Sequence, residues 1–237
     1  MSLTEHLLRP LLSTSAARPL ITHYDDAVGS RIELSVATLA NWAAKTANWL
    51  VEEFDVEPGD DVAVALPAHW QTAGVLLGAW WCGAHVVGAD DADSAAVAFV
   101  GPDADGSTAR ATALVALDPL GRGLTGPAPD GAFDYLNEAR VCGDDFSPLT
   151  PVDGDTPALL GTSVDDLLAR ARERAAVLGV AEGDRVYSTR DWTLPDGVVD
   201  AVLAPIAVGA HVVQVTNPDP ARAQAHRDAE RTTVDLA

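Results

Sequence analysis

The chain has 237 residues, 48% of them hydrophobic, and its 35 acidic and 15 basic side chains give a formal net charge of −20. This length buries a sizeable core, either in one large α/β domain or in two small ones. The negative field repels nucleic-acid phosphates and anionic lipid headgroups, so we expect neither nucleic acid nor a membrane as a partner.

The remaining composition favours a reduced, cytoplasmic protein. Cys82 and Cys142 have no metal-type spacing and make no disulfide framework. Arg9 and Pro10 interrupt the apolar run near the N-terminus, which is too short for a signal sequence or a membrane span. The acidity is typical of a soluble surface, and a basic partner is the alternative explanation.

After a short N-terminal segment, residues 35–87 have the pattern of helix, strand, helix and strand. Ser35 is a good N-cap, and apolar side chains recur at three- and four-residue steps from Val36 to Phe54. A Gly-Asp turn then leads into the apolar stretch Val62–Leu66, which suits a buried parallel strand. A second helix is predicted over Trp70–Cys82, before the strand sequence GAHVV.

The same order of elements recurs in residues 163–213. Ser163 caps a second amphipathic helix, another Gly-Asp turn leads into VYSTR, and a helix over Gly197–Val208 precedes a second GAHVV. The repeat predicts two βαβ crossovers, placed in one sheet or in two related lobes. It makes the glycines and histidines of the two GAHVV sequences (Gly83, Gly209, His85 and His211) architectural.

Between and after the copies the signal is weaker. Strands are predicted over Ala95–Gly101 and Ala111–Asp118, with short helices over residues 133–141 and from Asp219 to about Arg231. Residues 147–157 are rich in Pro and polar side chains and are expected to be an extended linker. We therefore expect two α/β subdomains, over residues 1–146 and 158–237, each with a parallel sheet in a layered α/β/α arrangement.

Two motifs suggest chemistry that their surroundings do not support. The sequence GRGLTG (Gly121–Gly126) matches a dinucleotide fingerprint, but Pro127 and Pro129 prevent the helix that must open there, so a loop is expected. The six histidines show no i, i+4 pair with a nearby acid, so no metal site is expected.

The best candidate pocket is formed by two loops that follow the predicted first strand of each copy. Loops at the carboxyl ends of parallel strands are where α/β proteins bind ligands. The loops are PAHW, which ends at Trp70, and TRDWTLPDG, which contains Trp192. The candidate residues are His69, Trp70, Asp191, Trp192 and Asp196.

Several of these motifs occur in register in a known superfamily. The segment over residues 34–87 is LSVATLANWAAKTANWLVEEFDVEPGDDVAVALPAHWQTAGVLLGAWWCGAHVV. It resembles the opening of acyl-adenylate-forming enzymes, the AMP-binding or acyl-CoA synthetase-like superfamily. The stretch from Gly179 to Val215 resembles the part that follows that family's phosphate loop. The resemblance implies the large domain of such an enzyme, which contains two related subdomains.

The departures from the family concern its chemistry. A phosphate-binding loop rich in Ser, Thr and Gly and ending in Lys should precede the second copy, and only Gly161-Thr162-Ser163 stands there. The family's aromatic-His motif would lie near Trp192–Gly197, which contains no histidine, and its later motifs and lid would fall beyond Ala237. Lys45, the single lysine, lies in the first helix. We therefore expect no catalytic residue, no metal and no cofactor, with ATP or AMP left as a possible ligand although the phosphate loop is missing.

Three interpretations follow. The first is a catalytically silent half of an adenylating-enzyme domain, retained for binding or association. The second is a module that binds an acyl or nucleotide ligand in the loops of Trp70 and Trp192. The third is an interaction protein, in which self-association or a protein partner covers an exposed apolar face. A separate possibility is an acyl-CoA synthetase or ligase half, with AMP-forming acid–thiol ligase activity, that requires a second half from another chain.

Overall fold

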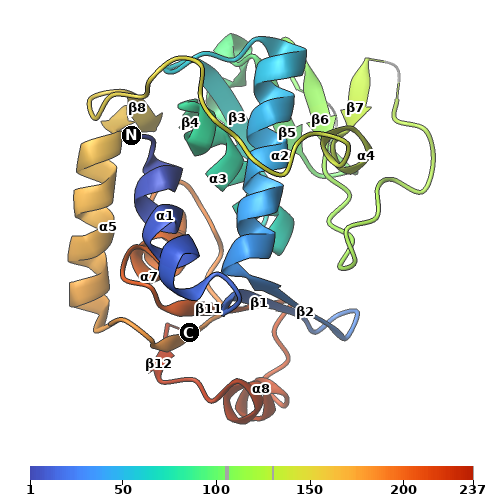
Figure 1. The fold of residues 1–237 in the computed structure, drawn as a ribbon. Helices are drawn as coiled ribbons and strands as arrows, with labels where there is room; N and C mark the ends of the chain where they lie inside the picture. Colours follow the sequence, from blue (N-terminus) through green and yellow to red (C-terminus); the bar gives the residue numbers. More distant parts are fainter. Residues whose placement is uncertain (105–106, 130, 237) are drawn as a thin grey trace. The chain divides into compact units, whose positions relative to one another are not determined.

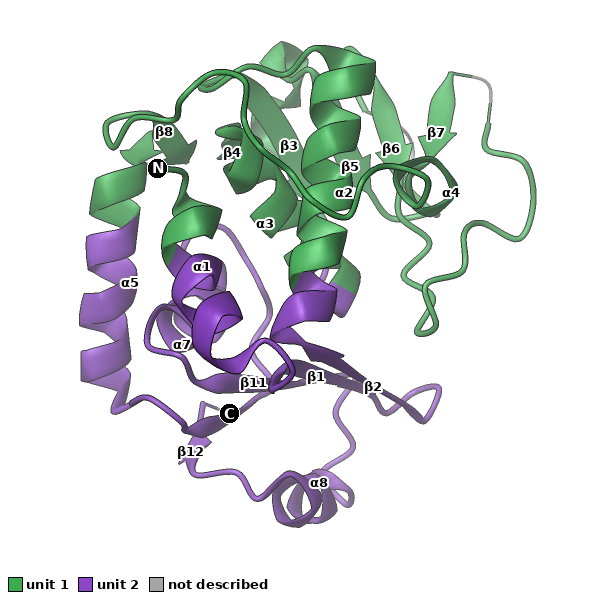
Figure 2. Cartoon of the chain, viewed as in Figure 1, with its two compact units in different colours: residues 1–6, 40–66, 71–167 green, residues 7–39, 67–70, 168–237 purple. Residues whose placement is uncertain are grey.

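The computed structural model describes residues 1–104, 107–129 and 131–236 (Figure 1). The chain forms two compact units, coloured separately in Figure 2, and each is built from discontinuous segments. The first unit contains residues 1–6, 40–66 and 71–167, and the second contains residues 7–39, 67–70 and 168–237. The units differ from the continuous ranges 1–146 and 158–237 because an N-terminal strand pairs with a C-terminal one. Those subdomain boundaries stay a prediction.

The first unit contains a seven-stranded sheet in the order β7-β6-β5-β3-β4-β8-β9. All neighbouring strands are parallel except β8 and β9. The strands are β3 (Asp61–Ala65), β4 (His85–Val87), β5 (Val97–Val100), β6 (Thr112–Leu114), β7 (Ala132–Asp134), β8 (Pro157–Leu159) and β9 (Thr162–Ser163). The predicted α/β class with parallel sheets is therefore confirmed.

The helical parts of this unit include the greater part of α2 (Val36–Phe54) and of α3 (Trp70–Cys82), the short α4 (Tyr135–Ala139) and the 3-10 turn η1 (Ala89–Ser94). A Cβ at Gly78 of α3 would lie 2.3 Å from the Cβ of Thr46, so α2 and α3 meet where only glycine fits. The Trp49 ring of α2 lies 6.0 Å from that of Phe99 on β5, which places α2 against the sheet.

The second unit contains a five-stranded sheet in the order β12-β10-β11-β1-β2. Its strands are β1 (Pro19–Asp25), β2 (Ser30–Ser35), β10 (Arg185–Ser188), β11 (His211–Thr216) and β12 (Val234–Asp235). Its helical parts include most of α1 (Leu3–Ser15) and α5 (Val164–Leu178), and α8 (Ala223–Glu230). The predicted helix over Gly197–Val208 is α6 (Asp196–Val198), the π turn η2 (Val199–Leu203) and α7 (Ala204–Ala207).

The first GAHVV lies where a helix ends and a buried strand begins. Gly83 has φ +88°, in the left-handed region, and its carbonyl accepts a hydrogen bond from Gly59 N–H at 2.9 Å. His85 N–H donates to the carbonyl of Asp60 at 2.8 Å, which starts β4 beside β3. The predicted Gly-Asp turn therefore sets the register of the two strands.

The second GAHVV repeats this geometry in the other unit. Gly209 has φ +74°, and its carbonyl accepts from Gly183 N–H at 3.4 Å. His211 N–H donates to the carbonyl of Asp184 at 2.8 Å. The two copies thus have the same local structure, and their common ancestry stays a prediction.

The structure confirms two further predictions from the sequence and contains some elements that were not predicted. Ser35 Oγ accepts from Thr38 N–H at 3.1 Å, as expected of the N-cap of α2. Residues 121–126 contain no helix, as predicted for GRGLTG. The sequence analysis did not anticipate α1, β1 and β2 in the N-terminal segment, or the strand β7 that precedes the predicted helix α4.

The two GAHVV glycines are expected to differ in their tolerance of alanine. In Gly83→Ala, an alanine held in the left-handed region lowers the free energy of unfolding by ~1–2 kcal/mol. The new Cβ also lies 2.8 Å from Val152 Cγ2, and this crowding lowers it by a further ~1–3 kcal/mol. In Gly209→Ala the nearest atom, Leu11 Cδ2, is 3.3 Å away, so mainly the backbone cost applies. Urea unfolding should therefore show a larger loss for Gly83→Ala.

Gly88→Ala is the matched control for that comparison. Gly88 has φ −82°, and a Cβ there meets nothing within 4 Å. We expect its unfolding free energy to change by less than about 0.5 kcal/mol. Equal losses for Gly83→Ala and Gly209→Ala would contradict the difference in packing described here.

Candidate functional site

The predicted loop residues His69 and Trp70 are buried and in contact with other rings. His69 is 5% exposed and Trp70 is 4% exposed. The ring of His69 lies edge-on to that of His23 on β1, with centroids 4.5 Å apart, and 5.7 Å from that of Trp70. These side chains therefore help to close the second unit at the carboxyl end of β1.

Trp192, from the other predicted loop, is equally engaged. It is 4% exposed, and its indole Nε1–H donates to Gln214 Oε1 on β11 at 3.0 Å. The Gln214 amide in turn donates to the carbonyl of Arg190 at 3.0 Å. A buried amide that satisfies both an indole and a backbone carbonyl holds the loop against the sheet.

Two neighbouring strand residues connect these loops. His23 and Gln214 are register partners in the parallel pair β1–β11. His69 contacts the first of them and Trp192 bonds to the second. The structure therefore brings both predicted loops to one edge of this sheet, through side chains that the sequence analysis did not select.

The two predicted carboxylates lie at the surface instead. Asp191 is exposed, and the side chain of Asp196 is 81% exposed and forms an ion pair with Arg170. They are thus separated by burial from His69, Trp70 and Trp192. That these five residues bind a ligand stays a prediction.

Burial keeps two histidines of this unit neutral at physiological pH. Desolvation lowers the pKa of His23 to about 4, against the opposing charge of Asp25. Desolvation and the positive charge of Arg185 lower the pKa of His211 to about 4. His211 Nε2 lies 2.9 Å from Thr22 Oγ1, while Nδ1 of each histidine has no hydrogen-bond partner within the described residues. Neither imidazole is poised as an acid or base near pH 7.

A two-residue turn occupies the position where the family resemblance places a phosphate loop. β8 ends at Leu159 and β9 begins at Thr162, and these two residues are paired across the hairpin. Leu160 and Gly161 have φ +44° and +79°, the left-handed values typical of a tight hairpin turn. The chain then enters α5 at Val164, so no extended loop intervenes.

The backbone N–H groups of this segment already have acceptors within the first unit. Leu160 N–H donates to the Val86 carbonyl at 3.0 Å and Gly161 N–H to His85 Nε2 at 2.8 Å. Further on, Val164, Asp165 and Asp166 donate to Thr156 O, Gly154 O and Ser163 Oγ at 3.0, 2.9 and 3.2 Å. Phosphate cradles need such N–H groups to point at the ligand, and the first turn of α5 also carries two carboxylates.

The ammonium group of Lys45, the single lysine, also has partners within the first unit. Lys45 Nζ donates to the carbonyls of Arg140 at 3.0 Å and Cys142 at 2.7 Å, and lies 2.8 Å from an Asp144 carboxylate oxygen. These contacts fasten α2 to the segment that follows α4. Lys45 is therefore a structural cation of the first unit.

His85 is part of a separate polar chain. Its Nδ1 lies 2.7 Å from Asp61 Oδ1, and Ser94 Oγ donates to the other oxygen of that carboxylate at 2.5 Å. Its Nε2 accepts the Gly161 N–H described above, so the ring is the neutral Nδ1–H tautomer. The residues of a hydrolase triad are present, but the carboxylate separates Ser94 from His85, so the histidine does not activate the serine.

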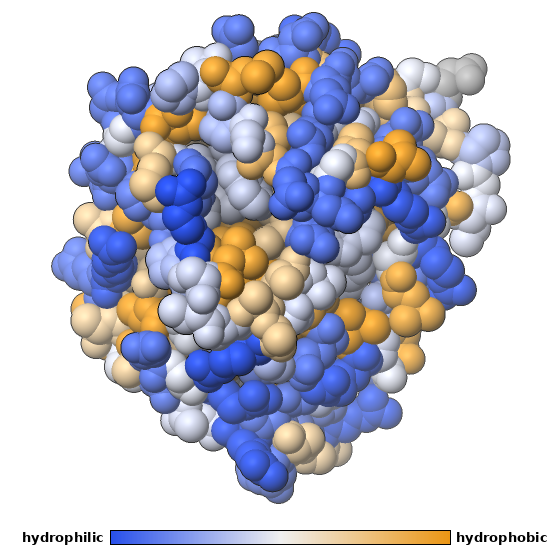
Figure 3. All heavy atoms as spheres, viewed as in Figure 1, coloured by the Kyte–Doolittle hydropathy of each residue, from blue (hydrophilic) through white to orange (hydrophobic). Residues whose placement is uncertain are grey.

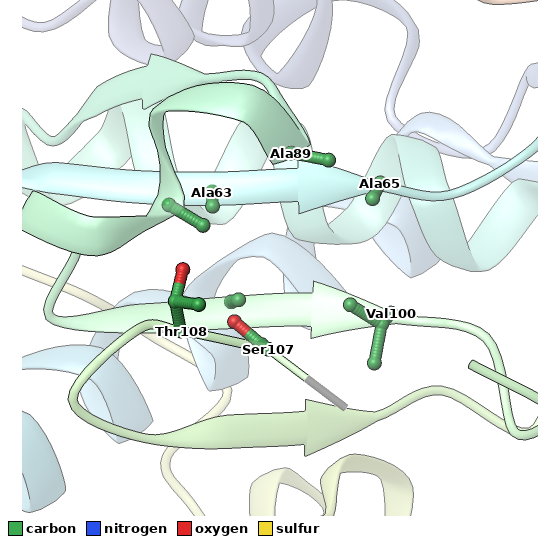
Figure 4. A pocket seen from close by; sticks show the side chains of 8 residues that line it. Ala63, Ala65, Ala89, Val100, Ser107 and Thr108 are labelled. Atoms are coloured by element: carbon green, nitrogen blue, oxygen red, sulfur yellow. The ribbon is translucent and has the colours of Figure 1, made fainter. Parts of the chain in front are cut away.

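The structure also contains a cavity of about 350 Å³ that the sequence analysis missed (Figure 4). We call it the alanine cavity. It lies on the sheet of the first unit, where β3 and β5 end, and η1 and the chain after β5 border it. Its lining residues are Ala63, Ala65, Ala89, Ala92, Ala98, Val100, Ser107 and Thr108. No sequence motif indicates this cavity, because alanines, which are common in any sequence, form most of its lining.

Residues 1–104, 107–129 and 131–236 contain no group of three or more His, Cys, Asp or Glu placed to hold a metal ion. Within these ranges no helix has the length and apolar character needed to span a membrane. The cytoplasmic location stays a prediction.

One curated protein resembles the whole chain. The "TIGR03089 family protein" of Mycobacterium tuberculosis (strain ATCC 25618 / H37Rv) is 44% identical over 239 residues, covering 98% of this chain and 97% of that protein. The chain belongs to the TIGR03089 family. No family model matches it.

Solved structures place this TIGR03089 member among adenylate-forming folds. The acyl-CoA synthetase of Brucella canis matches with a TM-score of 0.80 at 16% identity, over 99% of this chain and 47% of that one. The anthranilate CoA ligase AuaEII, solved with anthranoyl-AMP, matches with 0.74 at 16% identity, over 99% and 49%. The N-terminal domain of FACL13 from M. tuberculosis matches with 0.73 at 15% identity, over 99% and 62%.

These likenesses establish the fold. The chain spans about half the length of the first two solved proteins, and one match is itself an N-terminal domain. The resemblance to the N-terminal half of adenylate-forming enzymes is therefore confirmed for the architecture of the TIGR03089 protein.

The buried histidines predict a loss of stability in mild acid. The pKa of His211 is about 4 in the folded chain and 6.5 in an exposed histidine, a difference that corresponds to roughly 3 kcal/mol. Between these values the unfolded chain binds more protons, so the unfolding free energy falls as pH drops from 6.5 towards 4 and then levels off. Urea unfolding at pH 7, 6, 5 and 4.5 measures this loss.

The variant His211→Gln should reduce that loss by about half, because His23 contributes a similar share. Thr22→Val is the control, since it removes the hydroxyl beside His211 and leaves the imidazole buried. It should lower stability at every pH and keep the acid-dependent part. An unchanged pH profile in His211→Gln would contradict the burial assigned to this ring.

Proposed function

We propose that this TIGR03089 protein is a catalytically silent half of the adenylate-forming fold, retained to bind or to associate. The observation that carries the proposal is the turn at Leu160–Gly161. The N–H groups that precede and open α5 are hydrogen-bonded within the unit. A phosphate would have to break these bonds and approach Asp165 and Asp166, which repel it.

The missing positive charge supports the same proposal. Forming an acyl-adenylate requires stabilisation of charge that develops at the α-phosphate of ATP. Lys45 is held by two carbonyls and a carboxylate, and the net charge of the chain is −20. Among the described residues, neither Lys45 nor the turn at Leu160–Gly161 therefore offers a triphosphate a favourable contact.

Between binding and association, the surface favours binding. Large apolar side chains that are well exposed are single residues from different segments (Val28, Leu120, Val141, Leu149 and Val177). On the face shown in Figure 3, hydrophobic residues form separate patches among hydrophilic ones. A stable protein interface needs a larger continuous apolar area, so self-association or a partner is the weaker form of the proposal.

The alternative is a half enzyme that a second chain completes. It is favoured by the fold, since the protein solved with anthranoyl-AMP contains the same architecture over half its length. Under this alternative, this half still holds part of an acyl-adenylate, and the second chain supplies the phosphate contacts that are missing here. The two forms differ in whether the isolated protein binds an adenylate.

ATP–pyrophosphate exchange tests catalysis directly. We expect no exchange above background with the purified protein and a panel of short, long and aromatic carboxylic acids. A complete acyl-CoA synthetase in the same assay is the positive control. Exchange that depends on both ATP and an acid would overturn the proposal of catalytic silence.

Calorimetry tests whether a nucleotide binds at all. We expect no heat of binding for ATP, AMP or a non-hydrolysable acyl-adenylate analogue up to millimolar concentration, because the N–H donors are already engaged. Saturable binding of the analogue without exchange would instead support the half enzyme completed by another chain.

A further inference from the structure

The alanine cavity follows from the way the strands of the first unit are connected. Parallel strands of one sheet are usually joined by crossovers that carry an α-helix and cover one face of the sheet. Here β4 reaches β5 through the 3-10 turn η1, and β5 reaches β6 without an α-helix in its described residues. A single turn and loops cover less of the sheet than helices do.

The two faces of the same strands differ in side-chain size. Ala63 and Ala98 point to the cavity, and successive residues of a strand point to opposite faces. Their neighbours Val62, Val97 and Phe99 therefore face the other side, where the Phe99 ring packs near Trp49. Bulky residues fill one face and methyl groups line the other, so the space remains open.

The lining has an apolar body and one polar side. Ala63 and Ala98 form a floor that is 1% and 2% exposed. In Figure 4, Ala63, Ala65 and Ala89 lie on one side of the cavity, and the hydroxyl-bearing Ser107 and Thr108 lie on the other side with Val100. Small-molecule sites combine a mainly apolar wall with a few polar groups in this way, and 350 Å³ is within their usual range.

The turn that borders the cavity is acidic. Asp90, Asp91 and Asp93 belong to the turn that contributes Ala89 and Ala92 to the cavity, and all three are exposed. The guanidinium of Arg110, beyond Thr108, donates to the Phe54 carbonyl at 2.6 Å. An anion entering here meets carboxylates, so the charge selects against carboxylic acids and phosphates.

We propose that the alanine cavity is a binding site for a compact apolar alcohol or amine of about two fused rings. An apolar cavity of ~150 Å³ holds one benzene ring, so this volume accommodates roughly two. The apolar body fills the methyl-lined floor and the hydroxyl or ammonium group lies towards Ser107, Thr108 and the acidic turn. The site lies within one unit and does not rest on the proposed loss of adenylation.

Three probes that share one ring system test whether the acidic turn disfavours anionic ligands. They are 1-naphthalenemethanol, 1-naphthalenemethylamine and 1-naphthoate, each titrated by calorimetry into the full chain at low ionic strength. We expect saturable binding of the alcohol and the amine, with the naphthoate at least tenfold weaker than the alcohol. Equal affinity for all three overturns the charge argument, and no binding of the alcohol and the amine overturns the site.

Two variants test the location. Ala65→Leu places a larger side chain at the exposed edge of the cavity and should weaken binding of the alcohol at least tenfold without crowding the core. Ala98→Val narrows the floor and should weaken it as well. Ala225→Leu, on the exposed surface of α8 in the other unit, is the matched control and should bind as the unaltered chain does. Normal binding by Ala65→Leu overturns the proposed location.

Discussion

A glycine in the left-handed region joins a helix to a buried parallel strand in each unit, and each sheet depends on that junction. With φ +88° at Gly83 and +74° at Gly209, the chain reverses without a Cβ to obstruct it. The next bonds, from His85 and His211 N–H to aspartate carbonyls, align the strand with its neighbour. Because a slip of one residue would turn every side chain to the opposite face, this junction also decides which residues become the core.

The sequence predicted the elements that repeat or alternate over a long range, and missed those that depend on distant pairing. The periodicity from Val36 to Phe54 and the apolar helix over Trp70–Cys82 match α2 and α3. β1 lies between β2, the next strand in the chain, and β11, near the C-terminus, so its parallel pairing depends on a distant partner that leaves no local pattern. β7 is three residues long and is held by β6, which is again a non-local interaction.

The candidate site shows a similar division. Trp192 and His69 were selected because their loops follow predicted parallel strands at the carboxyl ends, where α/β proteins bind ligands, and the structure places both side chains at the same end of one sheet. What sequence reasoning could not supply is what they bond to: Gln214 satisfies the indole and His23 contacts the imidazole. The alanine cavity had no sequence signal, since alanines are common and a space beside them arises only where η1 and residues 107–108 lie against β3 and β5.

Two short connections explain why the turn before α5 presents no free N–H donors and why the alanine cavity exists. The turn at Leu160–Gly161 is too short to present free N–H groups, so the donors that would face a phosphate bond to the protein instead. The single turn η1 is too short to cover the sheet, so methyl groups on β3 and β5 line a cavity. A short connection thus engages its own N–H donors in one place and leaves an apolar space uncovered in another. The acidic turn beside that opening makes carboxylates poor ligands for it, although the fold is shared with enzymes that act on acids.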